Sequence, residues 1–278
     1  MSMRIGGHLN DSEMHLFNYE NNQNYYPDWK QKDRKLSSIM YELRKNIKPS
    51  NPAQSHLIKE STPISNQGPI NACVANAWAD MMEILSGLDG NTVVQLSRLF
   101  LYWTSRYYTG DTNKDNGTYL RSAATQLKNI GIVEERFFPY EGTVDVVYES
   151  PSLDLYTMAS NNRLSGFYKP DSKSIDQLLS DLEISIRSNH PFVFGVDVDS
   201  TFEEYSGGNH ILTAPSGEIK GSHAMICTGV GSDGSKRWWL LRNSWGKSWG
   251  DSGHVKVDDS YIKLINDIWV GVKSPIII

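Results

Sequence analysis

Two of the 278 residues are cysteines, and their sequence surroundings differ. Cys73 follows the turn-rich stretch 61–72 and opens an apolar-periodic stretch, 73–86, that predicts a helix. A thiol at a helix N-terminus faces unpaired backbone N–H groups and the positive end of the helix dipole, and both favour the thiolate. Cys73 is therefore a candidate nucleophile. Its ordinary alternative is the commonest one for a free cysteine, that of a small buried apolar residue.

Cys227 is expected to have a different role. It lies within 223–230, HAMICTGV, whose alternation and β-branched residues predict a half-buried strand. A free cysteine in such a strand usually packs in the core. We therefore expect Cys227 to pack in the core, whereas Cys73 stays a candidate nucleophile.

A histidine and an asparagine could complete a site with Cys73. His223 follows Gly221-Ser222 at the expected start of a strand, where its side chain can project into a cleft. Asn243 stands at the expected end of another strand, and Trp245 and Trp249 follow it within a turn. Indoles need a packing surface, so these are unusual turn residues. The ordinary alternatives are an edge-strand histidine and a turn-forming asparagine.

Together these segments resemble the papain-like cysteine peptidases, from about residue 62 to about residue 269. The motifs that support this are Gln67-Gly68 six residues before Cys73, Leu96-Ser97 with Phe100-Leu101-Tyr102, Asp115-Asn116-Gly117-Thr118, Gly221-Ser222-His223-Ala224, and Asn243-Ser244-Trp245-Gly246 with Trp249-Gly250. Gln, Cys, His and Asn occur in the family's order. Their joint occurrence is a much stronger indication than any single motif.

The resemblance implies peptide-bond hydrolysis by a Cys-His-Asn triad. Cys73 would attack the carbonyl, and His223 would pair with the thiolate and protonate the leaving nitrogen. Asn243 would orient the imidazolium, and Gln67 would bind the oxyanion together with the backbone N–H of Cys73.

Further roles follow from the same resemblance. Asn116, Gly117 and Ala224 would contact the substrate, and Trp245 would shield the bond between His223 and Asn243 from water.

The sequence also departs from the family pattern. Ile70 stands where the usual disulfide partner would be, which predicts an active-site loop without that bridge. Val74 replaces an aromatic residue, and one glycine, Gly117, stands where two are usual. The CVANA segment starting at Cys73 is closer to bacterial members than to plant or lysosomal ones.

Helix-rich and strand-rich stretches divide the chain, so we expect an α+β, papain-like fold with a helical left lobe, a β-rich right lobe and a cleft between them. The expected helices are 36–47, 73–86, 96–108, 118–130 and 175–188, and the expected strands are 192–198, 223–230, 237–244 and 254–257. We expect an N-terminal extension over 1–60 and a peptidase domain over 61–278, with lobes at about 67–165 and 166–278. Residues 1–34 lack a sustained period and are expected to be extended or loosely ordered.

The composition argues against several classes of function. The formal net charge of −5 argues against a general basic surface for nucleic acid. Two cysteines are too few for a disulfide framework or a four-cysteine zinc site. No stretch approaches the roughly 20 apolar residues of a membrane span, and no signal peptide is visible. We expect a monomer that acts on polypeptides without cofactor, metal ion, nucleic acid or membrane span, either cytoplasmic or exported by a non-classical route.

Functions other than peptide hydrolysis also fit parts of the sequence. A papain-fold binding protein without catalysis, or a thiol acyltransferase or amidase, would also fit a cysteine–histidine pair. The glycines at 229, 231 and 234 follow a strand as in a nucleotide site, but a predicted strand and not a helix comes next. Residues 1–60 could pack over the cleft and restrain activity, as in a zymogen, or simply complete the fold.

Overall fold

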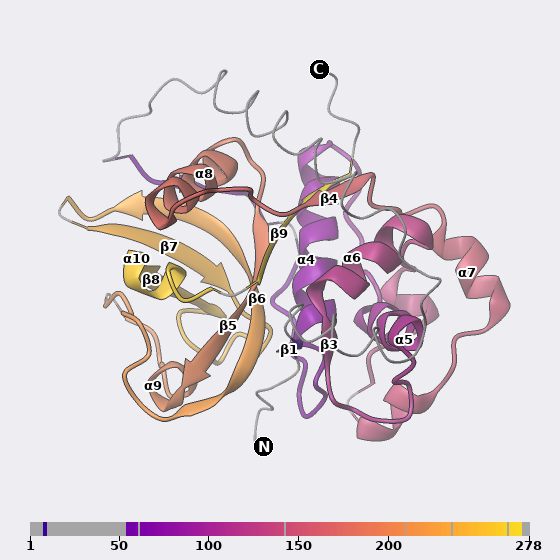
Figure 1. The fold of residues 1–278 in the computed structure, drawn as a ribbon. Helices are drawn as coiled ribbons and strands as arrows, with labels where there is room; N and C mark the ends of the chain where they lie inside the picture. The colour runs from indigo at the N-terminus through magenta and orange to yellow at the C-terminus, as the bar shows by residue number, and fades with distance from the viewer. Residues whose placement is uncertain are drawn as a thin grey trace.

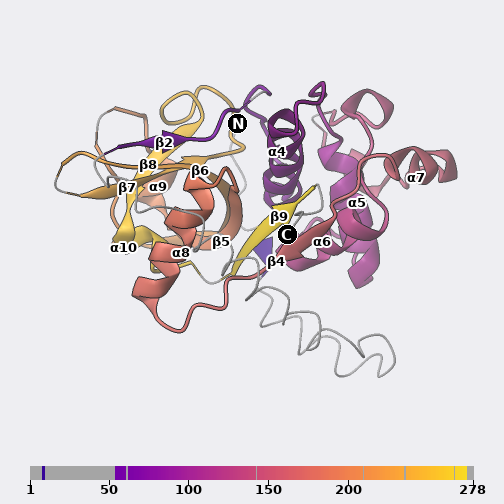
Figure 2. The same ribbon diagram turned by 90° about the horizontal axis from the view of Figure 1, so that it is seen from above.

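The computed structural model describes residues 8–9, 54–60, 62–141, 143–208, 210–234, 236–265 and 267–273. Helices α4 to α7 gather on one side of the molecule, and a twisted sheet with α8, α9 and α10 occupies the other (Figure 1). The view from above shows the same division, with α4 next to the sheet (Figure 2). The predicted α+β class is confirmed.

The helical side is built around α4, Cys73–Leu88, which is buried over its first 14 residues, from Cys73 to Ser86. It packs against α5 (Arg98–Thr109), α6 (Leu120–Asn129) and strand β6 of the sheet. The Ser97 hydroxyl caps α5 by accepting the Phe100 N–H at 3.0 Å. The shorter helix α7 (Leu153–Ala159) and the 3-10 turns η2 (Glu135–Phe137) and η3 (Val144–Tyr148) complete this side.

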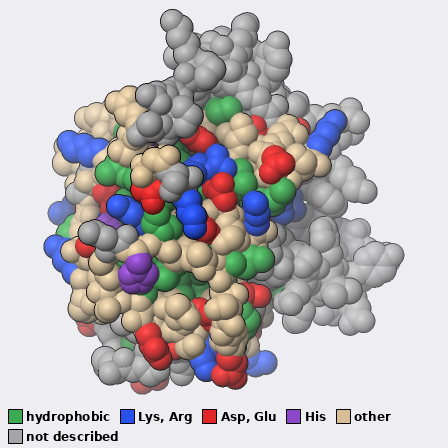
Figure 3. Space-filling view, turned by 90° about the vertical axis from the view of Figure 1, so that its left-hand side faces the viewer, with side chains coloured by type: hydrophobic (Ala, Val, Ile, Leu, Met, Phe, Trp, Pro, Cys, Tyr) green, Lys and Arg blue, Asp and Glu red, His purple; other side chains and the backbone are tan. Residues whose placement is uncertain are grey.

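The other side is a seven-stranded antiparallel sheet in the order β4-β9-β5-β6-β7-β8, with β2 also paired to β6. Its strands are β2 (His56–Leu57), β4 (Gly166–Tyr168), β5 (Phe192–Asp199), β6 (Ile219–Ser232), β7 (Arg237–Arg242), β8 (His254–Asp258) and β9 (Asp267–Val272). Helix α8 (Ile175–Arg187) packs on β6, and the short helices α9 (Ser200–Glu203) and α10 (Asp259–Ile262) follow β5 and β8. Acidic and basic side chains lie interspersed on the face shown in Figure 3.

Most expected elements are present, with shifted ends. The expected helices 73–86, 96–108 and 175–188 and the four expected strands match α4, α5, α8, β5, β6, β7 and β8. The expected helix 118–130 is wrong at its start, because Thr118–Tyr119 form strand β3 and α6 begins at Leu120. Strand β7 ends at Arg242, before Asn243. The expected helix 36–47 and nearly all of 1–34 lie outside the described residues.

Two segments from the first 60 residues join the fold. Strand β1, His8–Leu9, pairs in parallel with β3 and also contacts β6, so its backbone lies between the helical side and the sheet. Strand β2 pairs with Val230 and Gly229 of β6. The Ile58 N–H then donates to the Thr228 carbonyl at 2.8 Å, which continues this pairing.

Candidate active site

Cys73 occupies the first position of α4, as its sequence context predicts. Ala72 is the N-cap residue and provides no side-chain cap, so the first turn presents its N–H groups without one. The Cys73 side chain is buried, and α4 packs against β6, the strand that carries His223. The helix terminus supplies a positive local field for a thiolate.

His223 and Asn243 are hydrogen-bonded, with 2.8 Å between Nε2 and Oδ1. Because an amide oxygen only accepts, Nε2 carries the proton of this bond. The prediction that His223 lies at the start of a strand is wrong. Strand β6 begins at Ile219, and His223 is a fully buried interior residue paired with Val196 of β5.

Aromatic rings cover the imidazole of His223. The Trp245 ring lies 4.7 Å from it, centroid to centroid, at an interplanar angle of 33°. Phe202 of α9 contacts Trp245 edge-on at 5.5 Å and Trp249 at 5.0 Å. Trp245 and Trp249 are therefore packed, as the sequence predicts, and the His223 imidazole beside Trp245 is fully buried.

Gln67 is fully buried and held at each of its polar groups. Its backbone N–H donates to the Ser244 carbonyl at 2.8 Å, and its Oε1 accepts from the Ser244 hydroxyl at 2.7 Å. Its Nε2 donates to the Ile70 carbonyl at 3.0 Å, and its own carbonyl accepts from the Tyr140 hydroxyl at 2.9 Å. Gln67 is thus joined directly to the residue that follows Asn243.

The residues expected to contact substrate are split between the two sides. Asn116 is exposed, and Gly117, with φ +91°, leads into β3, whose edge pairs with β1. Ala224 is buried beside His223 and pairs with Gly195 of β5.

A family model described as "Papain family cysteine protease" matches residues 52–267. The chain belongs to the papain family of cysteine proteases. The match covers all four residues of the expected triad and oxyanion hole.

Similar proteins agree with this family assignment. An uncharacterized peptidase C1-like protein of Acanthamoeba polyphaga mimivirus is 26% identical over 226 residues, which cover 76% of this chain and 71% of the relative. Digestive cysteine proteinase 2 of Homarus americanus is 28% identical over 199 residues, 70% of this chain but only 57% of the relative. The structure of xylellain, a cysteine protease from Xylella fastidiosa, superposes with a TM-score of 0.72 at 24% identity, covering 84% of this chain and 89% of that one. The two-lobed papain fold expected from the sequence is confirmed.

Neither cysteine of this papain-family chain forms a disulfide. Cys227 is fully buried in β6, and its Sγ contacts the Gly229 carbonyl at 3.5 Å. Burial raises the pKa of the Cys227 thiol, which keeps it protonated and unreactive.

Buried charged side chains connect the two sides of the papain fold behind the site. Arg242, next to Asn243, donates to Asp80 of α4 at 2.9 Å and to Glu60 at 2.5 Å. Arg98 of α5 donates to Asp80 at 2.7 Å and to Glu83 at 2.5 Å. Sequence reasoning missed this network, although Asp80 and Glu83 within an otherwise apolar helix were a usable signal.

Glu60 connects this network to the segment that precedes Gln67. His254 Nε2 lies 3.1 Å from Glu60. Burial alone would raise the pKa of Glu60, but its hydrogen bonds and charge interactions with His254 and Arg242 outweigh burial and lower that pKa to about 2.

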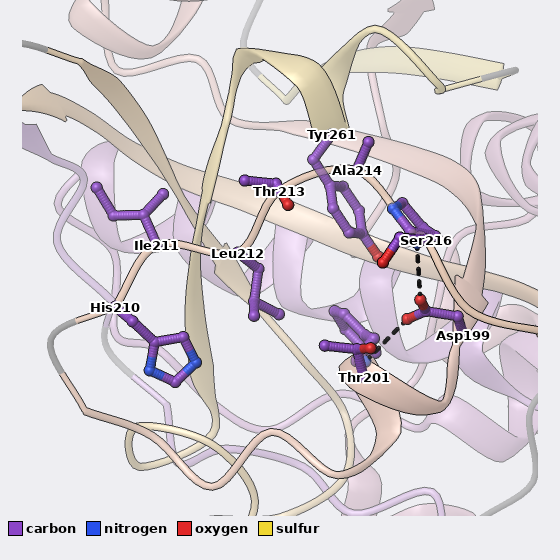
Figure 4. A pocket seen from close by; sticks show the side chains of 11 residues that line it. Asp199, Thr201, His210, Ile211, Leu212, Thr213, Ala214, Ser216 and Tyr261 are labelled. Carbon is purple, nitrogen blue, oxygen red and sulfur yellow. Dashed lines mark hydrogen bonds between the residues drawn. The ribbon is translucent and has the colours of Figure 1, made fainter.

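A cavity of about 230 Å³ adjoins the aromatic cover of His223, with which it shares Phe202 (Figure 4). It is lined by Asp199, Thr201, Phe202, His210, Ile211, Leu212, Thr213, Ala214, Pro215, Ser216 and Tyr261. Asp199 uses its carboxylate internally, accepting from the Phe202, Ser216 and Gly217 N–H groups. Within the described ranges, no group of three or more His, Cys, Asp or Glu side chains could hold a metal ion. No helix among those residues is long and apolar enough to cross a membrane.

Proposed function

We propose that the chain is a cysteine endopeptidase that hydrolyses peptide bonds through Cys73, His223 and Asn243. The observation that carries this proposal is the 2.8 Å bond between His223 and Asn243, packed under Trp245 on the strand that faces the Cys73 helix. A nucleophile at a helix start, an imidazole and an orienting amide are the groups that thiol-dependent acyl transfer needs.

In the proposed reaction the Cys73 thiolate attacks the carbonyl carbon, while the His223 imidazolium gives its proton to the leaving nitrogen. The amine departs and an acyl thioester remains on Cys73. His223 then takes a proton from water, which attacks the thioester and releases the acid. Asn243 holds the imidazole without adding negative charge.

Gln67 is proposed to supply one oxyanion donor through Nε2, and the backbone N–H of Cys73 the other. The bond from Ser244 supports this role, because it fixes the side-chain amide of Gln67 before substrate arrives, and the Tyr140 hydroxyl holds the Gln67 backbone carbonyl. A donor that is already positioned needs no reorganisation as charge develops.

Extended polypeptides are the proposed substrates. The edge of β3 beside Gly117 accepts a strand, since β1 pairs there, and an extended substrate could use the same backbone groups. Asn116 and Gly117 on one side, and Ala224 on the other, are the proposed contacts. The chain spans only 57% of the lobster relative, so its activity is inferred from its own site.

Peptide hydrolysis by the purified chain tests this proposal. We expect turnover of short fluorogenic peptides by the wild type, none by Cys73→Ala or His223→Ala, and nearly wild-type turnover by Cys227→Ser. Hydrolysis that survives in Cys73→Ala would overturn the assignment.

We also propose that the N-terminal segment restrains the site. Its strand β1 lies on the edge that substrate would use and contacts the strand of His223. We propose the boundary predicted from the sequence, with an extension over 1–60 and a peptidase domain over 61–278 divided into lobes at about 67–165 and 166–278. Residues 56–58 nevertheless pair with β6, so the segment 54–60 should stay in any shortened chain.

A chain that begins at Gln54 tests the restraint. It keeps β2 and the Glu60 contacts and loses β1. We expect a higher kcat/KM on a short peptide than the full chain shows, with an unchanged urea midpoint. Equal turnover by two folded chains would contradict the restraint.

A further inference from the structure

Asp115 joins two loops that are 44 residues apart in the chain. Its buried carboxylate accepts the Asn71 N–H, at 3.1 Å to Oδ1 and 3.3 Å to Oδ2. The Asn71 side-chain amide in turn donates to the Asp115 backbone carbonyl. Asn71 stands two residues before Cys73, so these bonds act on the loop that leads into the nucleophile.

Tyr102 of α5 extends the connection to β3. Its hydroxyl donates to Asp115 Oδ1 at 2.6 Å and accepts the Gly117 N–H at 3.1 Å. Burial raises the pKa of Tyr102, and the Asp115 charge adds to this, so the hydroxyl stays protonated and able to donate. Gly117 immediately precedes β3, whose backbone would pair with substrate.

Tyr140 connects the residues around Asp115 to Gln67, the proposed oxyanion donor. It donates to the Gln67 carbonyl, and its pKa is raised by burial and by the charges of Asp115 and Cys73. Neither cysteine forms a disulfide, so no such bridge holds this loop. Hydrogen bonds centred on Asp115 connect it to the substrate side.

We propose that Asp115 and Tyr102 are positioning residues, which hold the Cys73 loop and the substrate-pairing edge of β3 in one fixed relation. This inference rests on the proposed peptidase function. Asp115 acts on both loops, whereas Tyr102 acts mainly on Gly117 and β3. Substitutions at the two residues should therefore change different kinetic parameters.

Tyr102→Phe removes the acceptor of the Gly117 N–H and the hydroxyl that donates to Asp115 Oδ1, and leaves the bonds between Asn71 and Asp115 in place. We expect a KM increase of about 2- to 10-fold on an extended peptide, the size expected for one neutral hydrogen bond, with little change in kcat. Alkylation of Cys73 by iodoacetamide, which does not use the edge of β3, should proceed at the wild-type rate.

Asp115→Ala removes the acceptor for Asn71 as well. We expect about a 10-fold or larger fall in kcat and a slower alkylation of Cys73. Asp115→Asn keeps one acceptor oxygen and should lie between the wild type and Asp115→Ala, a graded rescue that a loss of folded protein alone would not produce.

The experiment measures kcat, KM and the rate of alkylation by iodoacetamide for each variant of the full chain. Mass spectrometry gives the concentration of Cys73 that can be alkylated, and the rates are divided by that concentration. The matched controls are Tyr107→Phe, an exposed hydroxyl on the same helix, and Asp171→Asn, an exposed carboxylate, and both should behave as wild type. Wild-type kinetics per site in Tyr102→Phe and Asp115→Asn, with only a lower melting temperature, would overturn the proposal. If the wild type cleaves no peptide, the peptidase function fails while the alkylation rates still test the Asp115 contacts.

Discussion

Asn243 Oδ1 lies 2.8 Å from His223 Nε2 and also accepts the backbone N–H of Ser244 at 2.8 Å. Two donors therefore fix the amide orientation, and the amide fixes the imidazole. The proton on Nε2 is committed to Asn243, which makes Nδ1 the nitrogen that would exchange a proton with the thiol and the leaving group.

Removing this amide should slow catalysis without unfolding the protein. We expect Asn243→Ala to lower kcat/KM about 10- to 150-fold, because a hydrogen bond to a charged partner contributes about 1.5–3 kcal/mol. Asn243→Asp adds a negative charge that stabilises the imidazolium, so the alkaline limb of its kcat/KM profile should move to higher pH. Steady-state profiles measure both effects, and an unchanged profile in both variants would argue against the orienting role.

The oxyanion role proposed for Gln67 predicts a larger loss of activity when Gln67 is replaced than when Ser244, which holds its side chain, is replaced. Gln67→Ala should lower kcat about 10²- to 10³-fold, the usual effect of one lost oxyanion donor. Ser244→Ala removes only the 2.7 Å bond that holds the amide oxygen, and we expect a loss of about 2- to 10-fold. Equal losses in the two variants would mean that Gln67 acts as a structural residue.

The buried ion pair between Arg242 and Asp80 predicts a stability effect. Both side chains are at most 2% exposed, so Arg242→Met leaves the buried carboxylates of Asp80 and Glu83 to share the single charge of Arg98, an excess of one buried negative charge. We expect the free energy of unfolding to fall by about 3–5 kcal/mol in urea titrations. Arg136→Met, which breaks an ion pair with a 71% exposed arginine side chain, is the control and should change it by less than about 1 kcal/mol.

The lowered pKa of Glu60 predicts how the free energy of unfolding depends on pH. Its pKa is lowered to about 2, so its contribution is fully present above its ordinary value near 4.5 and is lost as the pH falls toward 2. A lowering of this size corresponds to roughly 3 kcal/mol. The unfolding free energy of Glu60→Gln should therefore fall less between pH 4.5 and 2 than that of the wild type.

The control for this effect is Glu218→Gln, whose side chain is 82% exposed. It should follow the wild-type curve. Parallel acid curves for Glu60→Gln and the wild type would show that the contacts with His254 and Arg242 do not stabilise the charged carboxylate.

Local patterns made much of this fold predictable. The change from turn formers to an apolar period placed the start of α4 at Cys73, and alternation placed Cys227 in the core. The position of His223 was missed because β6 begins with Ile219, Lys220 and Gly221, a weak strand sequence that is held by pairing with β5. Pairing across the sheet overrode local propensity there.

Contacts between distant segments could not be read from the sequence. Arg242 and Asp80 are 162 residues apart, and Asn71 and Asp115 are 44 apart, so neither pair leaves a local periodicity. Strands of two residues, such as β1 and β3, are too short for an alternating pattern. The motif residues could be named from spacing, but the groups that hold them required the fold.

Labelling with a thiol-directed epoxide at neutral pH shows whether Cys73 is the nucleophile. Intact-mass and peptide mass spectrometry should show one adduct, located on Cys73, with parallel loss of peptide hydrolysis and with Cys227 unmodified. The chain that begins at Gln54 should be labelled as well, so that β1 cannot hide the thiol. No adduct in either chain would contradict the account and favour a papain-fold binding protein, and an adduct on Cys227 alone would contradict it outright.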